Sequence, residues 1–244
     1  MGNYKLKYKP FGSHSILIEW PQKIDENILN DVLNFKNNIQ HNYAKVKVEV
    51  INTYNSLTVY YTSTIENIYN EFSALNSLYV EQNTQKKREL KLWKIPVCYD
   101  LKFGIDLEEI SNRNNLSISQ FIELHSGPKY RVYFIGFLPG FLYLGGLPKE
   151  LNFPRKKNPR ISVEKGAVGI GGSQTGIYPQ QSSGGWNLIG NSPITLFERK
   201  KDPPCFAKPG DLVQFVPISL EQFEEITRLI AYKRYQIESE VIDA

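Results

Sequence analysis

The chain has 244 residues, of which 41% are hydrophobic and 22% are charged, and its formal net charge is +4. This length is enough for one large domain or two ordinary domains with real hydrophobic cores. Basic residues concentrate at 84–94 and 149–165 without a nucleic-acid recognition motif, so we expect solvated surfaces there and no binding of nucleic acid.

The first 94 residues alternate between strand and helix patterns. Period-two patterns predict strands at residues 4–8, 15–20, 46–50 and 57–61, and from Leu90 toward Pro96. Helical spacing predicts two helices, residues 25–40 with Asp25 as the N-cap, and a segment from Ile65 to Leu75. Strand, helix, two strands, helix, strand is the order of a ferredoxin-like α+β domain, which we expect to span residues 1–94.

The pattern changes beyond Pro96, in a second domain of residues 95–244. Two short helices are predicted at 107–115 and 118–125, the latter capped by Ser117 or Ser119. Short apolar runs then alternate with Gly and Pro, which predicts a many-stranded β-barrel or sandwich; the runs are YRVYFIGF, ISVEKGAVGIGG, PITLF and DLVQFVPI. A last helix is predicted at 219–238, where Ser219 and Gln222 form a capping box, with a core face of Phe223, Ile226 and Ile230.

The stretch from Gly136 to Gly190 is distinctive, because it contains 12 of the 17 glycines. Residues 166–197 carry no Asp, Glu, Lys or Arg, yet they are too rich in polar residues and glycine for a membrane helix. Glycine allows close backbone approach, and aromatic residues punctuate the stretch, as in a pocket or a docking surface. A tightly turned barrel wall with bulges has the same composition, and spacing alone leaves both interpretations open.

The N-terminal residues lack the apolar segment of a secretory signal, so we expect a cytoplasmic protein. The two cysteines, Cys98 and Cys205, form neither a metal nor a disulfide pattern, and we expect no metal site in this chain. Cys98 has no activating neighbour in the sequence, and is interpreted as a small buried hydrophobic residue.

Several segments of the second domain resemble one known family. They are IPVCYD from Ile95, DLEEI around Leu107, ELHS from Glu123, YRVYFIGFLPGFLYLGGL from Tyr130, the two PR pairs before residue 161, QTGIYP from Gln174, SSGGWNLIG from Ser182 and PGDLVQFVPI from Pro209. The chain resembles the family of the 5-oxoprolinase B subunit (PxpB), also labelled allophanate hydrolase subunit 1, which includes the sporulation-kinase inhibitor KipI. The resemblance implies a cyclophilin-like β-barrel for the second domain, whereas prolyl isomerase activity does not follow from that fold.

The resemblance further implies one component of a larger enzyme. The B subunit of such systems pairs with the C subunit and works with the A subunit, and together they open 5-oxo-L-proline to L-glutamate at the expense of ATP. No P-loop is present in this sequence, so ATP and magnesium are expected mainly on the partner subunits. The same motifs are compatible with a KipI-like inhibitor of a sensor histidine kinase, or with a subunit of an allophanate or urea-amide enzyme.

Charged and titratable residues in the matched segments are candidates for the site. His125 is the candidate general acid or base, although a histidine at a helix C-terminus is also favoured by the helix dipole. Arg155 and Arg160 each follow a proline, and their guanidinium groups suit a carboxylate or a phosphate, or the acidic residues of a partner subunit. Lys156 and Lys157 between them are predicted to be solvated.

The uncharged segments supply the remaining candidates. Gln174, Thr175 and Tyr178 are expected to exchange hydrogen bonds with an amide ring. The segment Ser182, Ser183, Gly184 and Gly185 is expected to offer backbone N–H groups to an oxyanion, as nest-like turns do, beside the pocket walls Trp186 and Phe141. Alternatively, this segment and the loop containing Phe137, Pro139, Gly140 and Phe141 dock a partner subunit, since aromatic residues also anchor interfaces.

Overall fold

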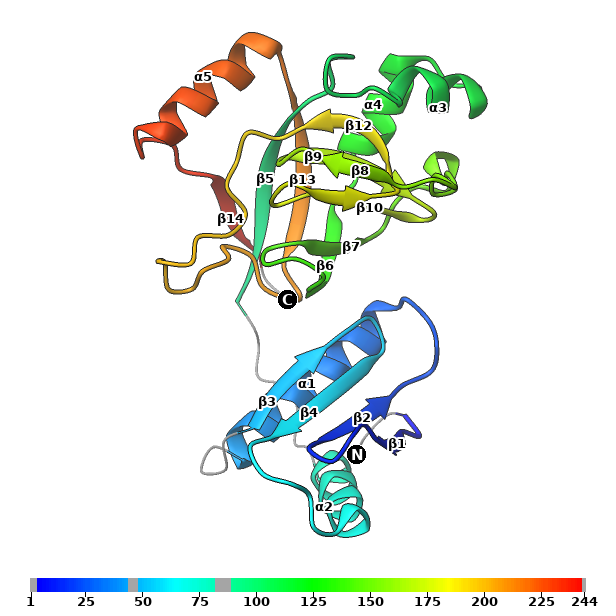
Figure 1. Ribbon diagram of the computed structural model, residues 1–244, viewed down its shortest axis with the longest axis vertical. Helices are drawn as coiled ribbons and strands as arrows, with labels where there is room; N and C mark the ends of the chain where they lie inside the picture. The colour runs from blue at the N-terminus through cyan, green and yellow to red at the C-terminus, as the bar shows by residue number, and fades with distance from the viewer. Residues whose placement is uncertain (1–3, 44–47, 82–88, 243–244) are drawn as a thin grey trace. The chain divides into compact units, whose positions relative to one another are not determined.

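The computed structural model describes residues 4–43, 48–81 and 89–242. The chain divides into two compact units, Met1–Lys87 and Arg88–Ala244 (Figure 1). Residues 84–88 of the basic segment 84–94, and the first residues of the strand predicted at 46–50, lie outside the described residues.

The first unit is a four-stranded antiparallel sheet with two helices. The strand order is β1-β2-β4-β3, with β1 at Lys7–Pro10, β2 at Ser15–Glu19, β3 at Val48–Asn52 and β4 at Ser56–Tyr61. Helix α1 (Glu26–Asn42) packs on β3, β4 and helix α2 (Ile68–Val80). The predicted cap is confirmed, because the Asp25 carboxylate accepts hydrogen bonds from the backbone N–H groups of Asn27 and Ile28.

The strand after Leu90, expected to complete this sheet, lies elsewhere. Strand β5 (Leu90–Cys98) pairs in parallel with β13 (Leu212–Ile218) of the second unit, in register from Leu92↔Leu212 to Cys98↔Ile218. The ferredoxin-like order is therefore not confirmed, and the expected boundary after Lys94 falls inside β5. Most of β5 is buried on both faces, as in a central strand, and such a strand carries no alternation that assigns it to one sheet.

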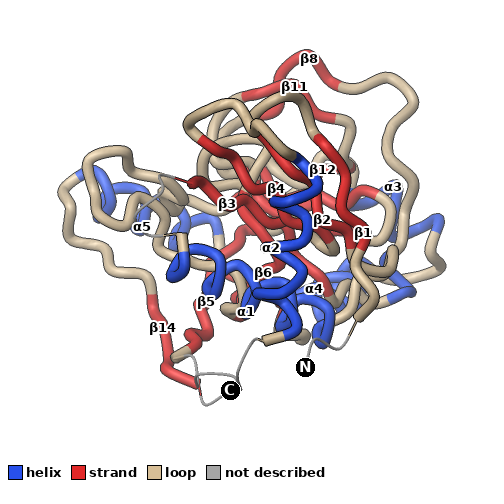
Figure 2. The backbone as a smooth tube through the Cα atoms, turned by 90° about the horizontal axis from the view of Figure 1, so that it is seen from below, coloured by secondary structure: helices blue, strands red, loops and turns tan. Residues whose placement is uncertain are grey.

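The second unit is a nearly closed β-barrel, consistent with the expected cyclophilin-like fold. Its main sheet has the order β10-β9-β12-β5-β13-β6-β7, and β10 also lies beside β7 (Figure 1). Strand β14 pairs with β5, and β8 and β11 form a separate pair (Figure 2). The remaining strands are β6 Tyr130–Ile135, β7 Leu142–Gly145, β8 Arg160–Val163, β9 Ala167–Gly171, β10 Gln174–Ile177, β11 Ser182–Gly184, β12 Asn187–Asn191 and β14 Glu238–Ile242.

Helices α3 (Leu107–Arg113) and α4 (Ile118–Ser126) confirm the two short helices, and Ser117 is the residue that caps α4. A 3-10 turn, η1, follows at Lys149–Leu151. The run PITLF is not a strand, because it contributes only the isolated bridge Phe197↔Cys205. No helix within the described ranges is long and apolar enough to cross a membrane.

The C-terminal helix is shorter than predicted. Helix α5 (Leu220–Ala231) begins with the predicted Ser219–Gln222 capping box, but residues 238–242 form β14 rather than its last turn. Its apolar face is not a core face, since Phe223, Ile226 and Ile230 are only half-buried. The helix lies at the periphery of its unit, which explains why a strongly amphipathic sequence buries no residue completely (Figure 1, Figure 2).

A buried carboxylate fastens the starts of β5 and β13. Asp211 is 1% exposed, and its oxygens accept hydrogen bonds from the Trp93 indole N–H at 2.9 Å, the Lys91 N–H at 3.1 Å and the Lys208 N–H at 3.0 Å. Because the Trp93 indole N–H is buried and the two backbone N–H groups are partly buried, each needs an acceptor within the fold, and Asp211 thereby fixes the register of the central strands.

We predict that Asp211→Ala lowers the free energy of unfolding of the second unit by about 3 kcal/mol, since it leaves the buried Trp93 indole N–H and two partly buried backbone N–H groups without an acceptor. Denaturant unfolding followed by tryptophan fluorescence measures this change. The matched control is Glu225→Ala on the exposed face of α5, which should alter stability by less than about 0.5 kcal/mol. An equally small effect of Asp211→Ala would contradict this role.

Candidate functional site

The glycine-rich stretch builds a barrel wall with two different faces. On β9, Val168 and Ile170 point into the main core, while Gly169 and Gly171 alternate with them on the outer face. On β10 the same alternation sends Thr175 and Ile177 inward and leaves Gln174 and Gly176 outside. The outer face of this wall therefore has almost no side chains of its own.

An aromatic cluster fills the space that these glycines leave. A Cβ atom on Gly171 would overlap the indole of Trp186, and one on Gly176 would lie 3.2 Å from that ring. Phe141 lies edge-on to Trp186 at 5.6 Å between ring centroids and to Tyr178 at 5.8 Å. All three rings are buried, so the cluster is a second small core on the outside of the barrel rather than the open wall of a pocket.

Arg155 covers the edge of this aromatic cluster. Its guanidinium lies 5.8 Å from the centre of the Trp186 ring and donates a hydrogen bond of 3.0 Å to the Gln174 side-chain oxygen. Burial raises the pKa of the Tyr143 and Tyr178 hydroxyl groups, and the positive charge of Arg155 opposes that rise at both. An exposed guanidinium, an amide and the half-buried Tyr143 hydroxyl group thus gather at one place above the buried Tyr178, where they are suited to binding an anion.

A buried carboxylate holds the loop that carries Arg155. Asp106 accepts hydrogen bonds from Arg160 at 2.7 Å, from the Lys156 ammonium at 2.8 Å and from the Leu188 N–H at 2.7 Å. Burial raises the pKa of Asp106, but these three donors outweigh it and hold the pKa below its usual value. The prediction that Lys156 is solvated is therefore wrong, whereas Lys157 is exposed as expected.

His125 lies inside the barrel, not at this surface. It is completely buried, its Nδ1 is 2.7 Å from the Tyr99 hydroxyl, and its Nε2 is 2.8 Å from the Thr175 hydroxyl. Thr175 donates its only hydroxyl proton to the Gly169 carbonyl oxygen, so Nε2 must carry the proton and Nδ1 must accept one from Tyr99. Both ring nitrogens are satisfied internally, and this geometry does not support contact between His125 and a substrate.

The structure thus separates the predicted site residues into three groups. Arg155 and Gln174 meet at the surface, above the buried Trp186 and Tyr178. His125 and Thr175 belong to the core, and Arg160 is committed to Asp106 and to the Trp186 carbonyl oxygen at 3.2 Å. Sequence reasoning missed Asp106, although it immediately precedes a predicted helix.

The segment Ser182–Gly184 is an extended strand paired with β8, not the predicted nest-like turn. A nest requires successive N–H groups to converge, which an extended strand does not provide. Gly184 instead makes room for Tyr178, because a Cβ atom there would overlap the tyrosine hydroxyl. Ser183 is exposed, and Gly185 accepts a hydrogen bond from the Lys156 N–H at 2.7 Å, which ties this segment to the Arg155 loop.

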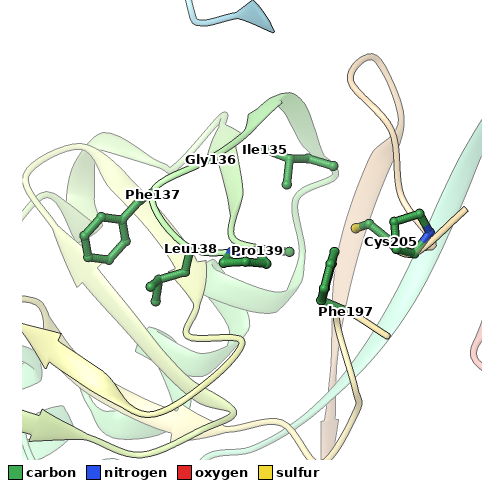
Figure 3. Close-up of a pocket in the computed structure, with 9 residues that line it drawn as sticks. Ile135, Gly136, Phe137, Leu138, Pro139, Phe197 and Cys205 are labelled. Carbon is green, nitrogen blue, oxygen red and sulfur yellow. The ribbon is translucent and has the colours of Figure 1, made fainter. Parts of the chain in front are cut away.

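The loop after β6 forms an apolar pocket of about 410 Å³ (Figure 3). Its lining includes Phe137, Pro139 and Gly140 from the predicted docking loop, whereas Phe141 turns into the aromatic cluster. The opposite wall comes from Phe197, Pro204 and Cys205. Among the described residues, no group of three or more His, Cys, Asp or Glu side chains is placed to hold a metal ion.

Comparison with known proteins identifies relatives over nearly the whole chain. Residues 6–207 match the family "Carboxyltransferase domain, subdomain C and D". The chain is 34% identical over 232 residues to the 5-oxoprolinase B subunit of Bacillus subtilis, covering 90% of this chain and 95% of that protein. It is 40% identical over 181 residues to the 5-oxoprolinase B subunit of Haemophilus influenzae, covering 71% of this chain and 81% of that protein.

Solved structures show the same fold within longer chains. The crystal structure of TTHA0988 matches this chain with a TM-score of 0.72 and a sequence identity of 31%. The match covers 84% of this chain and 40% of the TTHA0988 chain. The urea carboxylase of Kluyveromyces lactis matches with a TM-score of 0.81 and a sequence identity of 21%. The match covers 98% of this chain and 24% of the urea carboxylase chain. At that identity, the likeness to urea carboxylase concerns the fold.

We predict that His125 stays neutral in the folded chain, because burial lowers its pKa to about 3. In the unfolded chain, the His125 imidazole takes up a proton near pH 6.5. The free energy of unfolding therefore decreases as the pH falls from about 6.5 toward 3, by up to about 1.4 kcal/mol per pH unit. Unfolding measured at several pH values should show this slope, and His125→Asn should remove it. Nitrogen NMR of the imidazole should show the Nε2–H tautomer, and a protonation midpoint above about pH 5 would contradict the burial argument.

Proposed function

The chain belongs to the family of the 5-oxoprolinase B subunit, and we propose that it is the B subunit of an ATP-dependent 5-oxoprolinase that opens 5-oxo-L-proline to L-glutamate. The observation that carries this proposal is the identity of 34% with the Bacillus subtilis protein, which extends over 95% of that protein. A match of this length covers the barrel and the first unit together, so it concerns more than a shared fold.

The proposed enzyme is a complex of this chain with the C and A subunits in the cytoplasm, and this chain is inactive alone. When bound to the complex, ATP supplies the phosphoryl group that activates the lactam oxygen for attack by water on the ring carbonyl. This sequence contains no P-loop, and we therefore assign ATP and magnesium mainly to the partner subunits. The task left to this chain is to bind and orient a small anionic lactam.

Arg155 is the residue best suited to that task. Its guanidinium is exposed at one end and held at the other by Gln174 and the Trp186 ring, so it offers a preoriented fork to the substrate carboxylate. The amide of Gln174 and the hydroxyl group of Tyr143 lie close to the same charge and can donate to or accept from the lactam. Tyr178 is 3% exposed, so we assign it a packing role beneath these groups rather than contact with the substrate. We assign Trp186 to the floor of this site.

The other predicted residues act on the site from behind it. Arg160 holds the Trp186 carbonyl oxygen and Asp106, which fixes the position of the Arg155 loop. Thr175 and His125 hold β10 from the inside of the barrel, so we assign them positioning roles. Ser183, Gly184 and Gly185 shape the rim next to Tyr178.

The test of the function is glutamate release from 5-oxoproline and ATP by this chain co-expressed with the subunits encoded beside it. The complete complex should release glutamate, and omission of this chain should abolish the activity. Full activity without this chain would overturn the proposal. Substitution of urea or allophanate for 5-oxoproline tests the related chemistry, and turnover of either one alone would reassign the substrate.

We predict that Arg155→Ala raises KM for 5-oxoproline by about 10- to 100-fold, because a charge-assisted hydrogen bond to a carboxylate is lost. Arg155→Lys should recover only part of this, since an ammonium cannot pair through two parallel hydrogen bonds. The matched control is Lys157→Ala, which removes an exposed cation from the same loop. Equal effects of the two alanine variants would show that only the charge of the loop matters, and would contradict direct recognition by Arg155.

A further inference from the structure

We propose that the apolar pocket beside Phe137 is the docking site for an acidic segment of a partner subunit, which inserts one apolar side chain between the loop 135–140 and Phe197. This inference rests on the proposed function, because only a component of a complex requires such a partner. The partner is a different polypeptide of the complex, defined by its chemistry: negative charge around an apolar anchor.

The pocket is built for an apolar group. Two separate loops form its walls, Ile135 to Gly140 on one side and Phe197, Pro204 and Cys205 on the other (Figure 3). Gly140 is essential to this shape, because its φ is +84° and a Cβ atom there would lie 2.7 Å from the Phe197 Cβ. The two walls therefore meet at the bottom of the pocket without a side chain between them. A volume of about 410 Å³ is ample for one large apolar side chain.

Phe137 lies on the loop that forms one wall of this pocket, and its conformation is unfavourable. It is 67% exposed, and its φ of +65° lies in the left-handed region, which favours glycine over an aromatic residue. Leu138 and Pro139 lie between its ring and Phe197 in Figure 3. The ring makes one edge-on aromatic contact, with Phe141 at 5.8 Å. An exposed aromatic ring on a strained backbone contributes little to the stability of the isolated chain, and such strained positions cluster at functional sites.

The charge beside the pocket selects an acidic partner. Phe197 and Cys205 form a bridge that closes the base of the loop 198–204, and Arg199 and Lys200 lie on that loop. Both are exposed, and no carboxylate among the described residues pairs with either one, whereas their neighbour Lys201 is paired with Glu198 at 2.5 Å. The same loop carries the exposed Asp202, so its three cations exceed its two carboxylates by one charge. This positive excess beside an apolar pocket complements an apolar anchor flanked by Asp or Glu.

The decisive variant is Phe137→Gly. Glycine accepts a φ of +65° without strain, so the thermal unfolding temperature of the isolated chain should stay the same or rise. Affinity for the separately purified partner subunits, measured by calorimetry, should nevertheless fall by about 10- to 100-fold, as for an aromatic anchor at an interface. The control is Tyr232→Gly, an aromatic residue of similar exposure with no part in this pocket, which should leave the affinity unchanged.

The charge is tested by reversing Arg199 and Lys200 to Glu together. This variant should bind the partner at least 10-fold more weakly, and the difference should shrink at high salt because the ions screen exposed charges. Reversal of the exposed Lys149 and Lys157 is the matched control, and should have no such effect.

The outcomes separate this inference from the proposed function. If the wild-type complex releases glutamate but Phe137→Gly assembles with unchanged affinity, the docking site is wrong and the enzyme assignment stands. If the wild-type complex assembles through Phe137 but does not act on 5-oxoproline, the docking site stands and the assignment fails. Sedimentation of this chain alone completes the test, because self-association lost in Phe137→Gly would identify a second copy as the occupant and overturn a heterologous partner.

Discussion

The candidate site depends on the contact between one indole ring and a barrel wall without side chains. Trp186 lies directly on the backbone of β9 and β10, where Gly171 leaves no atom in the way and Gly176 leaves just enough room. Any larger residue at Gly171 would lift the ring, and with it the neighbouring Phe141 and Tyr178. Arg155 rests on the outer side of the same indole, so the position of the proposed anion-binding group follows from glycines on the wall behind it.

Two buried polar groups connect the helices to that wall. Asp106, at the start of α3, holds the Arg155 loop and the Leu188 backbone together. His125, in the last turn of α4, holds Thr175 on β10 from the inner face. Each is satisfied by partners from distant parts of the sequence, and a buried group with several partners specifies one arrangement because any other leaves a donor or acceptor unpaired. The geometry of the surface is thus fixed from within the barrel.

Local signals predict much of the fold, and fail where long-range pairing decides. The cap at Asp25, the capping boxes at Ser117 and Ser219 and the short helices α3 and α4 follow from neighbouring residues alone. Sequence reasoning assigns strand β5 to the first unit, because only its pairing with β13 reveals its sheet. In the site, the same reasoning finds Arg155 and Gln174 as ligand-binding candidates, but places His125 with them, since burial inside a closed barrel is not visible in a short motif.

The same glycine-rich stretch produces two apolar features, the buried aromatic cluster and the exposed apolar pocket. The first contributes to the stability of the chain, and the second is available for contact with another molecule. In the aromatic cluster, each glycine makes room for a ring that is then buried, so the apolar surface is satisfied within the chain. In the loop that follows β6, Gly140 opens a pocket instead, and Phe137 is held exposed with a left-handed φ beside it. The same loop buries the ring of Phe141 and leaves that of Phe137, four residues earlier, exposed to solvent. The exposure of Phe137 is therefore not explained by a general inability of this part of the fold to bury aromatic rings. The exposed residue breaks the local rules of backbone preference and burial that its neighbours obey, which is the behaviour expected of a residue retained for contact with another molecule.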